Sequence, residues 1–95
     1  MRISFRARGL VQGVGFRIFA RGAAQKIALA GWVANAPDDS VIGEAEGSAP
    51  QLAEFQNALR HGPPYGRVEH LEWRILDAPA SPRQEPLPHP FEIRR

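Results

Sequence analysis

The chain has 95 residues, no cysteine, a hydrophobic content of 43% and a formal net charge of +2. This composition predicts one small folded domain over residues 1–95 and argues against intrinsic disorder. The lack of cysteine excludes disulfides and thiol chemistry, and it favours a cytoplasmic location. No apolar run approaches the length of a membrane span, and the polar, arginine-rich start is unlike a secretory signal, so we expect no membrane partner.

Positive charge is concentrated at the start of the chain. No acidic residue precedes Asp38, whereas segment 1–26 holds the basic residues Arg2, Arg6, Arg8, Arg17, Arg21 and Lys26. This half of the protein would attract an anion, either a phosphorylated small molecule or a nucleic-acid backbone.

The first predicted elements are a strand and a helix joined by a glycine-rich turn. Residues 3–9 alternate apolar and polar side chains, which predicts a strand with Ile3, Phe5 and Ala7 towards the core. Residues 16–28 carry apolar side chains at three- to four-residue spacing, which predicts an amphipathic helix. Glycines in such a turn let backbone N–H groups converge, and the helix N-terminus adds unpaired donors.

Arg17 stands at the start of this helix, where a cation is disfavoured unless an anion lies beside it. Its planar fork matches the oxygens of a phosphate, although an ordinary surface arginine is the simpler alternative. The turn is neither a dinucleotide fingerprint, since Ile18 replaces the third glycine, nor a P-loop. We therefore predict a phosphate-binding loop made of Gln12, Gly13, Val14, Gly15, Phe16 and Arg17.

The remaining elements complete a recognisable order. Residues 31–35 and 41–46 predict two strands joined by a turn, and Ser48 with Gln51 forms a capping box that begins a helix ending at Gly62. Residues 67–76 predict a strand, residues 78–90 a proline-rich loop, and residues 91–94 a short edge strand. This order, βαββαβ, predicts an α+β fold: a ferredoxin-like split βαβ sandwich, with an antiparallel sheet and two helices on one face.

Several stretches resemble the acylphosphatase family, in the family's order and over nearly the whole chain. They are Gly9-x-Val11-Gln12-Gly13-Val14-Gly15-Phe16-Arg17, Gly31-Trp32-Val33-x-Asn35, Glu46-Gly47, Leu52-x-x-Phe55, Gly62-Pro63-Pro64 and Phe91-x-Ile93-Arg94. The resemblance implies the same ferredoxin-like fold and the hydrolysis of a carboxyl-phosphate by a stand-alone acylphosphatase. It implies Arg17 and Asn35 as the catalytic residues, a small acyl phosphate as partner, no cofactor and no metal; we expect a monomer.

By this resemblance Asn35 orients the attacking water, and the phosphate of the substrate takes its proton. The residues alone favour the simpler interpretation of Asn35 as a turn residue before Pro37. The family's usual basic residues are replaced by Leu10 and Ala34, which reduces the local positive field. Ala28 stands where the family commonly ends its first helix with a glycine, and a left-handed backbone there would cost about 1 kcal/mol.

Three other functions remain open from the sequence. One is the carbamoyl-phosphate-handling module of hydrogenase-maturation carbamoyltransferases, although Ile18 replaces a proline common in those modules. A second is a degenerate acylphosphatase-like protein without catalytic activity. The third is an RNA-binding module of the same element order, but Val14 replaces a stacking aromatic and residues 13–19 precede the first helix rather than lying on a later strand, so we expect no nucleic-acid partner.

Overall fold

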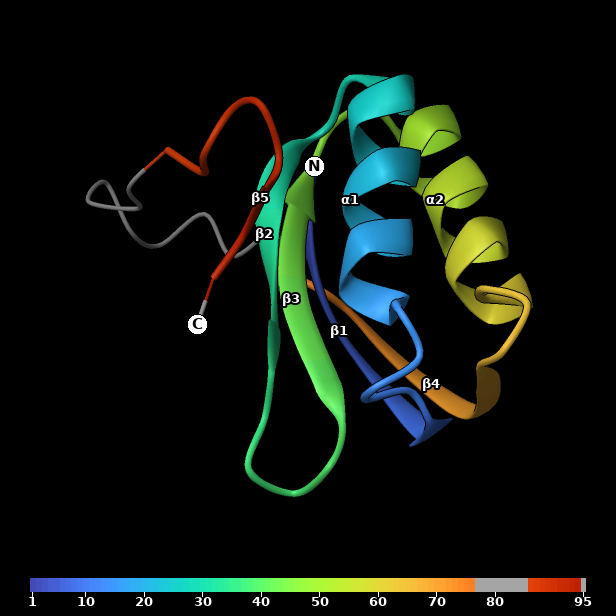
Figure 1. The fold of residues 1–95 in the computed structure, drawn as a ribbon. Helices are drawn as coiled ribbons and strands as arrows, with labels where there is room; N and C mark the ends of the chain where they lie inside the picture. The colour runs from blue at the N-terminus through green and yellow to red at the C-terminus, as the bar shows by residue number, and fades with distance from the viewer. Residues whose placement is uncertain (77–85, 95) are drawn as a thin grey trace.

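The computed structural model describes residues 1–76 and 86–94. Its elements are β1 (Arg2–Leu10), α1 (Phe16–Ile27), β2 (Ala30–Asn35), β3 (Val41–Glu46), α2 (Ala49–His61), β4 (Arg67–Ile75) and β5 (Glu92–Ile93). The five strands form one sheet in the order β4-β1-β3-β2-β5, and both helices cover the same face (Figure 1). This arrangement confirms the predicted α+β ferredoxin-like fold. Residues 77–85 of the predicted proline-rich loop lie outside the described residues, and residues 86–90 form no helix or strand.

One detail of the sheet differs from the antiparallel prediction. β5 pairs in parallel with β2, so the sheet is mixed. The cause is the path of the chain, because β4 ends where Ile75 faces Ile3, which is the end of the sheet at which β1 and β2 begin. Gly31 N–H already donates to the carbonyl oxygen of Pro88 over 2.8 Å, so the returning chain meets β2 at its start and runs along it in the same direction.

Strand alternation places the core on the helix-covered face. Ile3, Phe5 and Ala7 of β1 are buried and stand opposite Ala45, Gly43 and Val41 of β3. Phe55 of α2 packs edge-to-face against Phe5, with ring centroids 5.8 Å apart, and against Phe91 at 5.7 Å. These aromatic contacts join a helix, a central strand and the segment before β5 into one apolar core.

The same alternation sets the direction of Asn35. Val33 is fully buried on the helix-covered face, and Asn35 lies two residues further along β2 on that face, opposite Val41. Ala34 therefore points to the other face. The end of β2 and the loop that follows β1 lie at the same end of the sheet, beside the N-terminus of α1 (Figure 1).

Helix α1 ends at Ile27, one residue before the predicted end, and Ala28 is a left-handed residue, the conformation in which alanine carries a steric cost. Ala28 has φ 70° and ψ 36°; its N–H donates to the carbonyl oxygen of Gln25, and the N–H of Leu29 donates to that of Ala24. These two bonds form a Schellman motif, which normally has glycine at this position. Helix α2 begins with the predicted capping box, in which Ser48 and Gln51 each accept from the other's backbone N–H.

We expect Ala28→Gly to raise the free energy of unfolding by up to about 1 kcal/mol, because glycine adopts φ 70° without steric cost but loses more entropy on folding. Ala53→Gly is the matched control. Ala53 is exposed within α2, so the same replacement there should destabilise the protein by about 1 kcal/mol. Urea unfolding measures both variants, and a destabilised Ala28→Gly protein would contradict the strain at Ala28.

Candidate functional site

The N-terminus of α1 presents backbone donors with no side chain to satisfy them. Gly15 caps the helix in a left-handed conformation (φ 80°), no side chain caps the first turn, and the first turn holds no acidic residue. Gly13 also has a positive φ of 76°, and a Cβ at either glycine would meet no atom within 4 Å. The loop is thus shaped by glycine backbone and opens onto free space, where an anion would meet unpaired N–H groups.

A cavity of about 650 Å³ lies at this helix end. Arg17 and Asn35, the two predicted catalytic residues, both line it although they belong to different elements. The full lining is Val11, Gly13, Gly15, Phe16, Arg17, Ile18, Arg21, Asn35 and Ile93. Of the predicted loop residues, Gln12 and Val14 are not among those that line the cavity.

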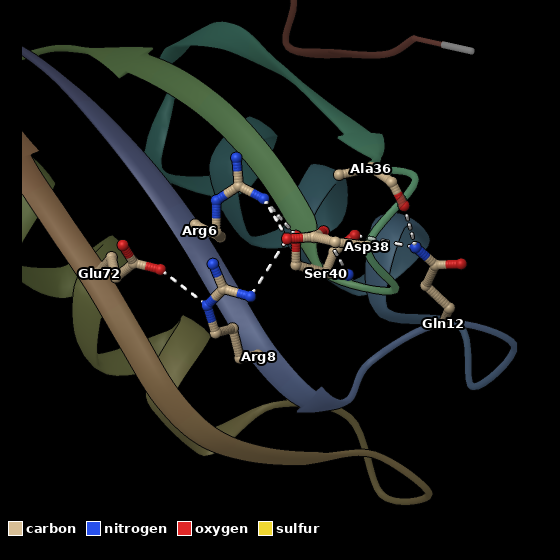
Figure 2. A network of polar contacts seen from close by, with 7 residues as sticks. All are labelled: Arg6, Arg8, Gln12, Ala36, Asp38, Ser40 and Glu72. Carbon is tan, nitrogen blue, oxygen red and sulfur yellow. Dashed lines mark hydrogen bonds and ion pairs between the residues drawn. The ribbon is translucent and has the colours of Figure 1, made fainter.

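The Gln12 side chain is used elsewhere. Its Nε2 donates to the carbonyl oxygens of Ala36 and Ser40, each over 2.9 Å. These bonds join the loop after β1 to the turn directly after Asn35 (Figure 2). The sequence predicts only a backbone role for Gln12, so the structure adds a side-chain role that holds the two halves of the site together.

Ion pairs hold the same turn from the open face of the sheet. Asp38 accepts from Arg6 over 2.8 Å and from Arg8 over 3.1 Å, and Arg8 also pairs with Glu72 of β4 at 2.9 Å (Figure 2). The other Asp38 oxygen accepts from the Ser40 hydroxyl and from the Ser40 backbone N–H. Hydrogen bonds from Ser40, followed by the two arginines, lower the pKa of Asp38 to about 2.

Four residues that line the cavity were not among the predicted site residues, namely Val11, Ile18, Arg21 and Ile93. A signal existed for Arg21, because it follows Arg17 by four residues and therefore lies on the same face of the helix. No such signal marked Ile93, since only the parallel pairing of β5 with β2 brings it beside Val33.

The described residues show neither a cluster of metal ligands nor a membrane-spanning helix. In residues 1–76 and 86–94, no group of three or more His, Cys, Asp or Glu side chains is placed to hold a metal ion. No helix of these ranges is long and apolar enough to cross a membrane.

Fold and cavity together define an α+β protein with a pocket at a helix N-terminus, lined by two arginines and a carboxamide. The acylphosphatase family model matches residues 3–92. An acylphosphatase of Nitratidesulfovibrio vulgaris is 44% identical over 93 residues, covering 98% of this chain and 89% of that protein. The crystal structure of the Bacillus subtilis acylphosphatase superposes with a TM-score of 0.85 at 32% identity, covering 99% and 98% of the two chains.

The chain belongs to the acylphosphatase family, and the hydrolysis of acyl phosphates is its reaction class. The alternative of a module from a larger enzyme has weaker support. T. kodakarensis HypF resembles this chain at 26% identity and a TM-score of 0.78, but the match covers only 12% of that protein. The RNA-binding alternative loses its motif, because residues 13–19 form a loop and the start of α1 rather than a strand.

We expect Asp38→Asn to destabilise the protein at pH 6 and to have progressively less effect as the pH falls towards 2. The folded-state pKa of Asp38, about 2, lies below the ordinary value of 3.8, so the carboxylate stabilises the fold above pH 4 and loses that effect as it becomes protonated. Urea unfolding of both proteins between pH 6 and pH 2.5 measures the difference.

Asp39→Asn is the control for this experiment, because it removes a charge from the same turn and none of the Asp38 contacts. A destabilisation by Asp38→Asn that is the same at every pH would contradict the ionic role of Asp38.

Proposed function

We propose that this protein hydrolyses small acyl phosphates with Arg17 and the loop from Gln12 to Arg17 binding the phosphate and Asn35 orienting the attacking water. The observation that carries the proposal is that Arg17 and Asn35 meet in one cavity at the uncapped N-terminus of α1. Backbone N–H groups of the loop and the guanidinium of Arg17 are the donors that a phosphate dianion requires.

The reaction suits such a site because it needs positioning more than covalent help. Water attacks phosphorus, the bond between phosphorus and the acyl oxygen breaks, and the acyl group leaves as a carboxylate. The transition state is loose, so fixed donors around the phosphoryl oxygens and an aligned water supply most of the required stabilisation.

The proton of the attacking water also needs an acceptor. The residues that line the cavity include no Asp, Glu or His. We therefore assign the proton to an oxygen of the substrate phosphate, with Asn35 holding the water. A carboxamide suits this role, because it accepts and donates hydrogen bonds without placing a negative charge near the phosphate.

We further propose that residues 1–95 form one domain that acts as a monomer in the cytoplasm. The sheet face opposite the helices carries Arg6, Arg8, Glu44, Glu72 and Arg74, so this face is suited to water rather than to an apolar partner. The lack of cysteine is compatible with a reducing compartment.

The direct test is release of inorganic phosphate from acetyl phosphate in excess EDTA, with Arg17→Lys as the site variant. We expect the wild type to turn over without added metal and the variant to lose at least about 10²-fold in rate, because an ammonium cannot form the bidentate fork. Arg60→Lys, which is exposed on α2, is the matched control. Turnover like the wild type in Arg17→Lys would contradict the assignment, as would activity that EDTA removes and a divalent metal restores.

Asn35→Ala separates binding from catalysis. If Asn35 orients the water, the variant should fold, inorganic phosphate should still inhibit it with a similar inhibition constant, and kcat should fall by about 10²- to 10³-fold. The two measurements are kcat for acetyl phosphate and inhibition by phosphate. A kcat close to that of the wild type would return Asn35 to the role of a turn residue.

A further inference from the structure

Arg21 lines the cavity but has no role in the proposed function. No side-chain hydrogen bond or ion pair joins Arg17 or Arg21 to another residue in 1–76 or 86–94. Arg17 is explained by the phosphate at the loop. Arg21 lies a full helical turn further on, about 6 Å along the axis, so its function needs a separate explanation.

The position of Arg21 follows from its neighbours on the helix. Residues 17, 21 and 25 share one face of α1, and Gln25 Nε2 donates to the carbonyl oxygen of Phe91 over 2.9 Å. This face of α1 is therefore turned towards the chain that enters β5, and Arg21 lies between that anchor and the phosphate loop. The cavity extends along α1 past the loop, with Ile18 and Ile93 on its apolar walls.

The described surroundings offer Arg21 no anionic partner. The cavity lining contains no carboxylate. Glu92, the acidic residue of β5, stands in register with Trp32 on the other face of the sheet and bonds to Arg94 over 3.2 Å. A substrate with a neutral acyl group, such as acetyl phosphate, would also leave Arg21 unpaired.

We propose that Arg21 forms a second anion subsite, and that the preferred substrates are acyl phosphates whose acyl group carries a further carboxylate or phosphate. The inference rests on the proposed function, because the reacting phosphate must occupy the loop for the acyl group to extend along α1. In this arrangement Ile18 and Ile93 contact the carbon skeleton and Arg21 pairs with the distal anion.

The test compares substrates that differ by one charged group: benzoyl phosphate, 4-carboxybenzoyl phosphate and 4-phosphonobenzoyl phosphate. These are assayed with the wild type, Arg21→Gln and Lys26→Gln; the last removes the same charge from an exposed position on the same helix, outside the cavity. We expect Arg21→Gln to lower the ratio of kcat/KM for a charged substrate to that for benzoyl phosphate by about five- to tenfold, mainly through KM. In Lys26→Gln that ratio should equal the wild-type value, and in the wild type it should fall as salt is added.

Arg21→Gln should lower the kcat/KM ratio more for one of the two charged substrates. A larger drop for 4-carboxybenzoyl phosphate identifies the distal group as a carboxylate, and a larger drop for 4-phosphonobenzoyl phosphate identifies it as a phosphate. If Arg21→Gln slows all three substrates equally, Arg21 serves the reacting phosphate and the second subsite is wrong. A ratio unchanged by Arg21→Gln, with hydrolysis intact, also overturns the inference but leaves the proposed function in place. Failure of the wild type to hydrolyse any of the three would instead overturn the proposed function, and with it this subsite.

Discussion

The Gln12 carboxamide donates its two hydrogens to the chain that follows β2, one to the carbonyl oxygen of Ala36 and one to that of Ser40. Ser40 also accepts from the backbone N–H of Ala36 over 2.8 Å, so the turn is closed on itself and then tied to the loop. Each bond contributes about 1 kcal/mol to stability. Their greater importance is geometric, because Arg17 and Asn35 belong to separate segments and no local geometry sets the distance between them.

The turn held by Gln12 also contains a left-handed residue. Asp39 has a φ of 71°, which costs a residue other than glycine, asparagine or aspartate more than it costs Asp39. Asp38 is held by Arg6 and Arg8 on one face of the sheet, and Gln12 bonds to the same turn from the loop, so the turn is restricted from both sides. The turn after Asn35 is thus fixed by contacts from two directions, which is the support that a water-orienting side chain requires.

The sequence was sufficient wherever a local rule decided the outcome. The capping box of Ser48 and the alternation of β1 each depend on neighbouring residues, and the structure confirms both. Contacts between distant segments were not predictable in this way. The parallel β5 depends on which end of the sheet the returning chain reaches. The requirement for glycine at position 43 is a contact of the same kind, because the ring atom Cζ of Phe5 lies 2.5 Å from where a Cβ would stand.

The same distinction between local rules and contacts of distant segments applies to the candidate site. The loop, Arg17 and Asn35 could be proposed from motifs because each motif is contiguous, whereas the Gln12 side-chain bonds join residues more than twenty positions apart. Arg21 lies between these cases: its spacing from Arg17 is local, but its place in the cavity depends on β5 and on the Gln25 bond to Phe91. The helical periodicity therefore predicts that Arg17 and Arg21 share one face of α1, but it could not predict that this face lines the cavity.

The distribution of positive charge around α1 bears on how an anion is selected. Leu10, where the family commonly has a basic residue, is 55% exposed and does not line the cavity, and Ala34 faces the other side of the sheet from Asn35. The cationic groups that do line the cavity are Arg17 and Arg21. Arg17 stands in the first turn of α1, where it opposes the helix dipole, and Arg21, four residues further on, is a like charge on the same helix face. A bound anion relieves that repulsion and satisfies the free N–H groups at the same time. The binding free energy of an anion thus includes the relief of an unfavourable charge arrangement in the empty protein, and this relief is largest for a ligand whose charges reach both arginines.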